Sequence, residues 1–146
     1  YVVQEIPTGN WSGLVFRTDV PPFDNVNVRR ALRMVVDRQE MLKLALDGGG
    51  IVSCDTPVAP SDQYRADMDC ARDIEGAKQL LAEAGYPHGL KIKLHVAAVD
   101  AAWEAMALVF QDHAAQAGID VEIVNASADG YWSEVWMKKD AFATSW

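Results

Sequence analysis

Aromatic residues are concentrated in the last part of the chain, between residues 131 and 146: Tyr131, Trp132, Trp136, Phe142 and Trp146. Indole and phenol rings offer flat apolar faces on which ligands stack, and each carries one polar group that needs a partner or water. Trp136 and Phe142 are expected to fill the core. Trp132 and Trp136 are four residues apart, so on a helix they could also share one buried face.

Catalytic chemistry has little support in the sequence. The serines lack a Gly-x-Ser-x-Gly setting, and the triplet 48–50 has no following Gly-Lys-Ser, so it is a better helix end than a phosphate loop. His113 falls on the apolar face of a predicted helix, which is typical of a core histidine. His95 is expected to be partly exposed, with no partner that the sequence identifies. We therefore predict no catalytic residues and no enzymatic activity.

Two cysteines, Cys54 and Cys70, lie in a polar segment rich in proline and aspartate. They are either two free thiols or a disulfide that closes a loop of about 17 residues, worth roughly 3 kcal/mol. A zinc site is not expected, because none of the three histidines has ligand spacing to the cysteines. No metal and no cofactor are predicted.

Composition sets further bounds. The chain has 146 residues, of which 50% are hydrophobic, and its net charge is −8. This suits one globular domain with a substantial core. No basic stripe is present, so a nucleic-acid partner is not expected, and acidic neighbours make the arginines at 29, 30 and 33 a solvated helix face. The apolar runs are too short to cross a membrane.

Alternation of apolar residues predicts strands over 11–17, 91–96, 119–123 and 141–146. One long helix is predicted from the cap at 24–25 to Gly48, followed by an ordered loop over 51–72. Further helices should begin at Asp73 and Asp100, and a short one at Asp129. Strands and helices that alternate between tight glycine turns predict an α/β sandwich with a largely parallel sheet.

Three segments resemble one known family. Residues 21–38 read PPFDNVNVRRALRMVVDR, residues 73–90 read DIEGAKQLLAEAGYPHGL, and residues 129–134 read DGYWSE. Together, and in this order, they closely resemble motifs of the family-5 extracellular solute-binding proteins, the dipeptide, oligopeptide and nickel receptors of bacterial ABC importers.

The resemblance implies a periplasmic-binding-protein-like lobe, of class α/β, with a largely parallel or mixed sheet flanked by helices. Residues 1–146 would be a single domain, most of the C-terminal lobe of a two-lobe receptor, because members of the family are several times longer. Such a receptor captures a small solute, most often a short peptide, and delivers it to ABC permease subunits at the membrane. The implied periplasmic location favours the Cys54–Cys70 disulfide, since disulfides persist in oxidising compartments.

The resemblance also implies a site. Trp132 is similar to the tryptophan that opens a short helix beside the ligand pocket of peptide-binding relatives. Trp146 is similar to the tryptophan of a Gly-Trp-x-x-Asp segment near the hinge, although Ser145 stands where the family usually has glycine or another small residue. We predict Trp132, Trp146 and Tyr131 as ligand-binding residues. Arg29 and Arg30 are expected to brace the start of their helix against carboxylates.

Two other functions remain open from the sequence. One is a small hydrolase or transferase with an α/β sandwich, which would need a nucleophile at a strand-to-helix turn and a base within reach. The other is an interaction domain that docks a partner through exposed tryptophans.

Overall fold

The computed structural model describes residues 8–146, and within them four strands form one mixed sheet in the order β1-β4-β2-β3. The strands are β1 (Ser12–Phe16), β2 (Leu90–Ala97), β3 (Ile119–Ala126) and β4 (Ala141–Ser145). β2 pairs in parallel with β3 and with β4, and β1 is antiparallel to β4. The prediction of an α/β lobe with a largely parallel or mixed sheet is confirmed.

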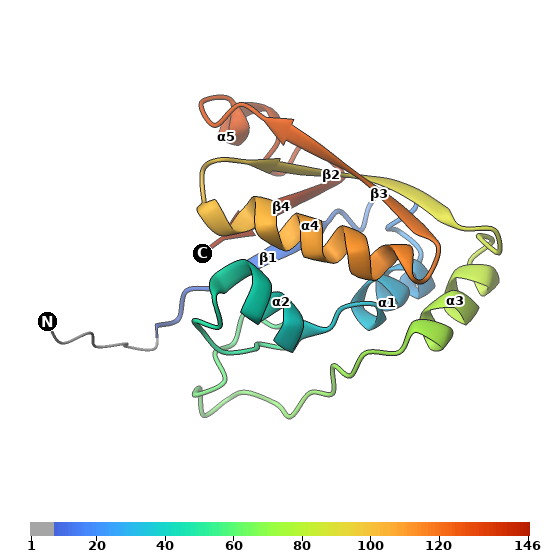
Figure 1. Cartoon of the computed structure of the whole chain (residues 1–146), viewed down its shortest axis with the longest axis horizontal. Coiled ribbons are helices and arrows are strands. Elements are labelled where there is room, and N and C mark those ends of the chain that lie inside the picture. The colour runs from blue at the N-terminus through green and yellow to red at the C-terminus, as the bar shows by residue number, and fades with distance from the viewer. Residues whose placement is uncertain (1–7) are drawn as a thin grey trace, which may run out of the picture.

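The helices are α1 (Val26–Met34), α2 (Arg38–Leu46), α3 (Ile74–Glu83), α4 (Ala101–Ala115) and the single turn α5 (Tyr131–Glu134). In Figure 1, α1 to α4 lie on one side of the sheet, and α5 lies near the carboxyl ends of β2 and β3. None of the helices in the described part of the chain is long and apolar enough to cross a membrane.

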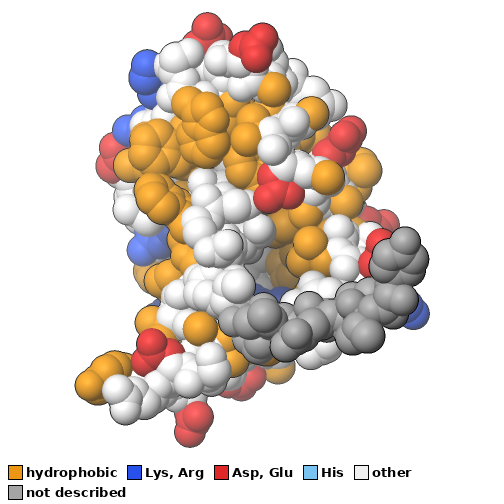
Figure 2. All heavy atoms as spheres, turned by 90° about the vertical axis from the view of Figure 1, so that its left-hand side faces the viewer, with side chains coloured by type: hydrophobic (Ala, Val, Ile, Leu, Met, Phe, Trp, Pro, Cys, Tyr) orange, Lys and Arg blue, Asp and Glu red, His pale blue; other side chains and the backbone are white. Residues whose placement is uncertain are grey.

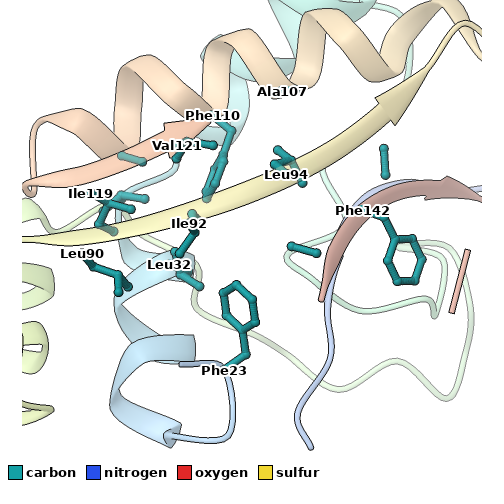
Figure 3. Close-up of a cluster of buried hydrophobic side chains, with 14 of the residues drawn as sticks. Phe23, Leu32, Leu90, Ile92, Leu94, Ala107, Phe110, Ile119, Val121 and Phe142 are labelled. Carbon is teal, nitrogen blue, oxygen red and sulfur yellow. The ribbon is translucent and has the colours of Figure 1, made fainter. Parts of the chain in front are cut away.

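The core lies between the sheet and the helices. Along β2 the even-numbered residues from Leu90 to Val96 are buried, while Lys91 and Lys93 are exposed. Figure 3 shows β2 with Phe110 of α4 and Leu32 of α1 among the side chains that pack around it. Each such large apolar side chain contributes about 1.5–3 kcal/mol when it leaves water.

β2 and β3 begin side by side at two glycines. Gly89 and Gly118 both have a positive φ, of +108° and +81°. A Cβ at position 89 would lie 2.6 Å from the carbonyl oxygen of Gly118. Only glycine therefore fits at Gly89, and this close approach starts the parallel register that pairs Leu90 with Ile119.

The prediction of one long helix from residue 25 to Gly48 is wrong. α1 ends at Met34, and α2 begins at Arg38. Asp37 has an extended backbone, with ψ of 104°, and its carboxylate accepts hydrogen bonds from the backbone N–H of Gln39 and Glu40. This is an N-cap, which starts a new helix in a new direction.

The other predicted helix starts are mostly confirmed. The side chain of Asn25 caps α1, that of Asp73 caps α3, and that of Asp100 caps α4. α5 is the exception, because Gly130 occupies the N-cap position and no side chain makes a capping bond. Asp129 therefore precedes α5 without capping it.

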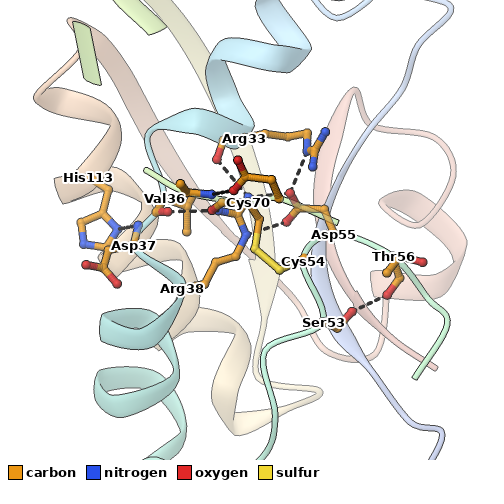
Figure 4. A network of polar contacts seen from close by, with 12 residues as sticks. Arg33, Val36, Asp37, Arg38, Ser53, Cys54, Asp55, Thr56, Cys70 and His113 are labelled. Carbon is orange, nitrogen blue, oxygen red and sulfur yellow. Dashed lines mark hydrogen bonds and ion pairs between the residues drawn. A yellow bond between two sulfur atoms is a disulfide. The ribbon is translucent and has the colours of Figure 1, made fainter. Parts of the chain in front are cut away.

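The segment 51–72 contains no helix or strand, as predicted, and is fixed to the rest of the chain by polar contacts. A disulfide joins Cys54 to Cys70, with their Cα atoms 5.4 Å apart. Arg38 donates to the carbonyl oxygen of Cys70 at 2.7 Å and to the carboxylate of Asp55, which also accepts from Arg33 at 2.8 Å (Figure 4). Burial by itself would raise the pKa of Asp55, but hydrogen bonds and positive charge from the two arginines lower it overall.

Candidate functional site

The carboxyl ends of the parallel strands β2, β3 and β4 lie at the same end of the sheet, together with α5 and the C-terminal residue (Figure 1). In open α/β sheets this is the edge at which ligand crevices form. The site is therefore built from α5 and from the end of β4.

Three indole rings lie in a row at this edge. Trp132 is 51% exposed and Trp146 is 63% exposed, and half-buried Trp136 lies between them. The ring centroids are 5.9 Å apart for Trp132 and Trp136 and 6.0 Å apart for Trp136 and Trp146. We call these three residues the tryptophan surface. Figure 2, which looks onto the left-hand side of Figure 1, shows hydrophobic side chains gathered on the upper part of this face, with acidic side chains around them.

Trp136 was predicted in the core, and this is corrected. α5 ends at Glu134, and Val135, which is 3% exposed, takes the buried position instead. Trp136 packs on the outside of the core and is partly exposed. A single helical turn is too short to impose the four-residue spacing that would have buried Trp136.

Tyr131 lies beneath the tryptophan surface and not in it. Its side chain is 0% exposed, and its hydroxyl donates to the carbonyl oxygen of Ala143 at 2.5 Å. Burial raises the pKa of Tyr131 to about 12, against the opposite effect of the bond to Ala143. Tyr131, which the resemblance implied as a ligand-binding residue, is thus buried in this structure and packs against Trp132, with ring centroids 5.6 Å apart.

Trp103 is a structural partner of this surface that was not predicted from the sequence. It is 1% exposed, and its ring centroid lies 5.0 Å from that of Tyr131 and 6.3 Å from that of Trp132. Its Nε1–H donates to the hydroxyl of Ser145 at 2.8 Å. The signal was available, because Trp103 precedes Phe110 by two helical turns and so shares its buried face.

Neither His113 nor His95 is part of the tryptophan surface. His113 is 2% exposed, lies 3.0 Å from a carboxylate oxygen of Glu40, and accepts a hydrogen bond from the backbone N–H of Asp37 (Figure 4), which confirms it as a core histidine. His95 is partly buried, with Nδ1 3.1 Å from the carbonyl oxygen of Ala141. Among residues 8–146, no group of three His, Cys, Asp or Glu side chains is placed to hold a metal ion.

Arg29 was expected to meet carboxylates, but within residues 8–146 its side-chain partners are backbone carbonyl groups. Its guanidinium donates to the carbonyl oxygens of Phe23 and Asp24, at 2.8 and 2.9 Å, and so ties the preceding loop to α1.

A separate hollow of about 200 Å³ is lined by residues such as Phe23, Lys93 and Lys139, and none of the three tryptophans lines it.

The whole sequence, residues 1–146, matches the profile described as "Bacterial extracellular solute-binding proteins, family 5 Middle". The chain belongs to this family. The resemblance stated from the segments 21–38, 73–90 and 129–134 is therefore confirmed.

Relatives within the family differ in what their names say they bind. The chain is 32% identical over 128 residues to the dipeptide-binding protein of Escherichia coli K12, a match that covers 84% of the chain and 24% of that protein. It is 42% identical over 84 residues to heme-binding protein A of Haemophilus influenzae, covering 56% of the chain and 15% of that protein. The chain thus spans a quarter or less of the length of these two relatives.

Solved structures from the family share the fold. NikA from Staphylococcus aureus in complex with Ni(L-His)2 superposes with a TM-score of 0.82 at 26% identity, covering 94% of this chain and 30% of that one. The dipeptide-binding protein of Pseudoalteromonas sp. SM9913 in complex with Met-Leu gives 0.83 at 25% identity, covering 94% and 28%. The periplasmic-binding-protein-like lobe is thus confirmed as the fold of this chain.

Proposed function

We propose that this chain forms most of the C-terminal lobe of a two-lobe receptor that captures a small solute and delivers it to ABC permease subunits. The solute that we favour is a short peptide. The receptor works outside the cytoplasmic membrane, in the periplasm, and it binds its solute without changing it chemically.

The observation that carries this proposal is the tryptophan surface. Two exposed indoles, Trp132 and Trp146, stand at the carboxyl edge of the sheet. Trp132 packs on the buried rings of Tyr131 and Trp103, and Trp146 packs on half-buried Trp136. Large apolar side chains gathered in this way on a soluble domain mark a binding site. Their ring faces can stack on a solute that a second lobe covers from the other side, by the hinge closure typical of two-lobe receptors.

Two features support the finer parts of the proposal. The disulfide between Cys54 and Cys70 suits an oxidising compartment such as the periplasm. Peptides are favoured because two similar proteins, the dipeptide-binding protein of Escherichia coli and that of Pseudoalteromonas, are named for dipeptides. The heme-binding and nickel-complex relatives make those solutes the next classes to test.

Native mass spectrometry of the full-length protein, purified from its source, tests the proposal. We expect a population that is heavier than the protein alone by the mass of a small solute, which is released on denaturation. A full-length protein that carries no added mass, and that takes up nothing from a mixture of di-, tri- and tetrapeptides, heme and Ni(L-His)2, would contradict it.

A further inference from the structure

The hydroxyl of Ser145 is the centre of a hydrogen-bond network beneath the tryptophan surface. Its oxygen lies 2.8 Å from Nε1 of Trp103, 2.9 Å from a carboxylate oxygen of Asp100 and 2.8 Å from the hydroxyl of Ser12. These partners come from α4, from its N-cap and from β1, so a single oxygen joins three elements of the fold.

Donors and acceptors in this network can be assigned from their chemistry. A serine hydroxyl has one proton to donate and two lone pairs to accept with. The Asp100 carboxylate can only accept, so it takes the Ser145 proton, and the indole N–H of Trp103 can only donate. Ser12 must therefore donate its own proton to Ser145. Every hydrogen-bonding position of the Ser145 hydroxyl is then filled, which leaves it one orientation.

The network fixes the positions of both ends of the tryptophan surface. Trp146 directly follows Ser145, and its backbone pairs with that of Trp11 at 2.7 and 2.9 Å. Trp103, held by Ser145, contacts Trp132 edge to face. Asp100 uses its second carboxylate oxygen to cap α4 at the N–H of Ala102. The end of β4 is thereby locked against the first turn of α4.

We propose that Ser145 is a positioning residue, which sets the distance and angle between Trp146 and Trp132 by binding Trp103 and Asp100. The consequence for solute binding rests on the proposed function, whereas the geometry does not. A glycine or alanine at position 145 would leave the indole N–H of Trp103 without this acceptor and the end of β4 free to shift. The row of indoles would then lose its single arrangement.

Circular dichroism of the full-length protein without solute tests this proposal. Indoles in contact couple their electronic transitions and give a paired positive and negative band in the spectrum. The difference between the spectra of wild type and Trp146→Phe gives the part of this band that Trp146 contributes. Ser145→Ala should lose most of that part, and Ser145→Thr, which keeps the hydroxyl, should retain it. Ser133→Ala is the matched control, because within residues 8–146 the Ser133 hydroxyl bonds only to the carbonyl oxygen of Gly130, at the N-cap position of α5, and its loss should change nothing.

A Ser145→Ala protein that keeps the Trp146 contribution would overturn the proposal, as would a Ser145→Thr protein that loses it equally. Should Ser145→Ala fail to fold, Ser12→Ala decides: it removes one of the three bonds and should lose a smaller part of the band, and an unchanged band would overturn the proposal. Because no solute is present, this result is independent of whether the receptor binds peptides. If Ser145→Ala loses the band and the wild-type receptor takes up no solute, the positioning role of Ser145 stands. Only the proposed function is then contradicted.

Discussion

Tyr131 and Trp132 are neighbours in sequence, but Tyr131 is buried inside the domain and Trp132 lies on its surface. Tyr131 is 0% exposed and hydrogen-bonded to the strand β4 through Ala143, whereas Trp132 is 51% exposed, with its ring edge to face on that of Tyr131. The short α5 is thus anchored by one aromatic residue and presents the next one to solvent.

Tyr131→Phe tests this anchor. The change should lower the free energy of unfolding by about 1–3 kcal/mol, because it leaves the carbonyl oxygen of Ala143 buried without its partner. Urea unfolding measures this loss. An unchanged midpoint would mean that the bond to Ala143 does not hold α5.

The same residue should make stability depend on alkaline pH. The pKa of Tyr131 is about 12 in the folded chain, above its ordinary value of 10.0. The folded state therefore holds the proton more tightly, so this contribution is complete below pH 10 and is lost as the pH rises towards 12. Unfolding of Tyr131→Phe should be less sensitive to pH in this interval than that of wild type, and equal sensitivity would contradict the assignment.

The two neighbouring tryptophans should respond differently to truncation. Trp136→Ala should destabilise the domain by about 2 kcal/mol, less than the 3–5 kcal/mol of a fully buried aromatic residue, because Trp136 is only half buried. Trp132→Ala should destabilise it less. Thermal unfolding of the two variants gives the comparison, and a larger loss for Trp132 would reverse their assigned roles.

The disulfide should be complete and should stabilise the loop 51–72. Thiol titration of the denatured, unreduced protein should find no free thiol, because Cys54 and Cys70 are bonded. Replacing both by serine should cost about 3 kcal/mol, the value for a closed loop of this length. Limited proteolysis should then cut within 51–72 faster than in wild type. Two free thiols per chain would contradict the structure.

Asp55 should make stability depend on acidic pH: its contribution is lost as the pH falls, whereas that of Tyr131 is lost as the pH rises. Its pKa in the folded chain is below the ordinary value of 3.8, despite burial, because Arg38 and Arg33 bind the carboxylate. Its contribution is therefore present above pH 3.8 and is lost as the pH falls through the lower folded value. The stability difference between wild type and Asp55→Asn should shrink as the pH falls from about 6 to about 2. A difference that is constant over this range would contradict the role assigned to the ion pairs.

Local patterns predicted most of the fold. The alternation in β2 and the aspartates before α3 and α4 gave the correct elements because each signal acts within a few residues. The break between α1 and α2 was missed, although Asp37 with Glu40 three residues later is a helix-start signal, because the apolar pattern continues across it. The antiparallel position of β1 depends on contacts more than a hundred residues apart, and no local pattern specifies it.

The candidate site was predicted less completely than the fold. Trp132 and Trp146, which the resemblance implied as ligand-binding residues, are both exposed, at the start of a helix and at the end of a strand. The places of Tyr131 and Trp136 depend on how one helical turn rotates against β4, which periodicity cannot fix in four residues. The role of Ser145 arises only when α4, β1 and β4 come together.

Calorimetric binding of the natural solute, once mass spectrometry has identified it, tests the central claim most directly. In the full-length receptor, Trp132→Ala and Trp146→Ala should each weaken binding at least about fivefold, as expected when about 1–3 kcal/mol of aromatic contact is removed. Tyr64→Ala is the matched control, because Tyr64 is an aromatic residue that is 85% exposed but belongs to the loop 51–72 and not to the tryptophan surface. It should bind as tightly as wild type. Unchanged affinity in both tryptophan variants would contradict the claim that this surface holds the solute.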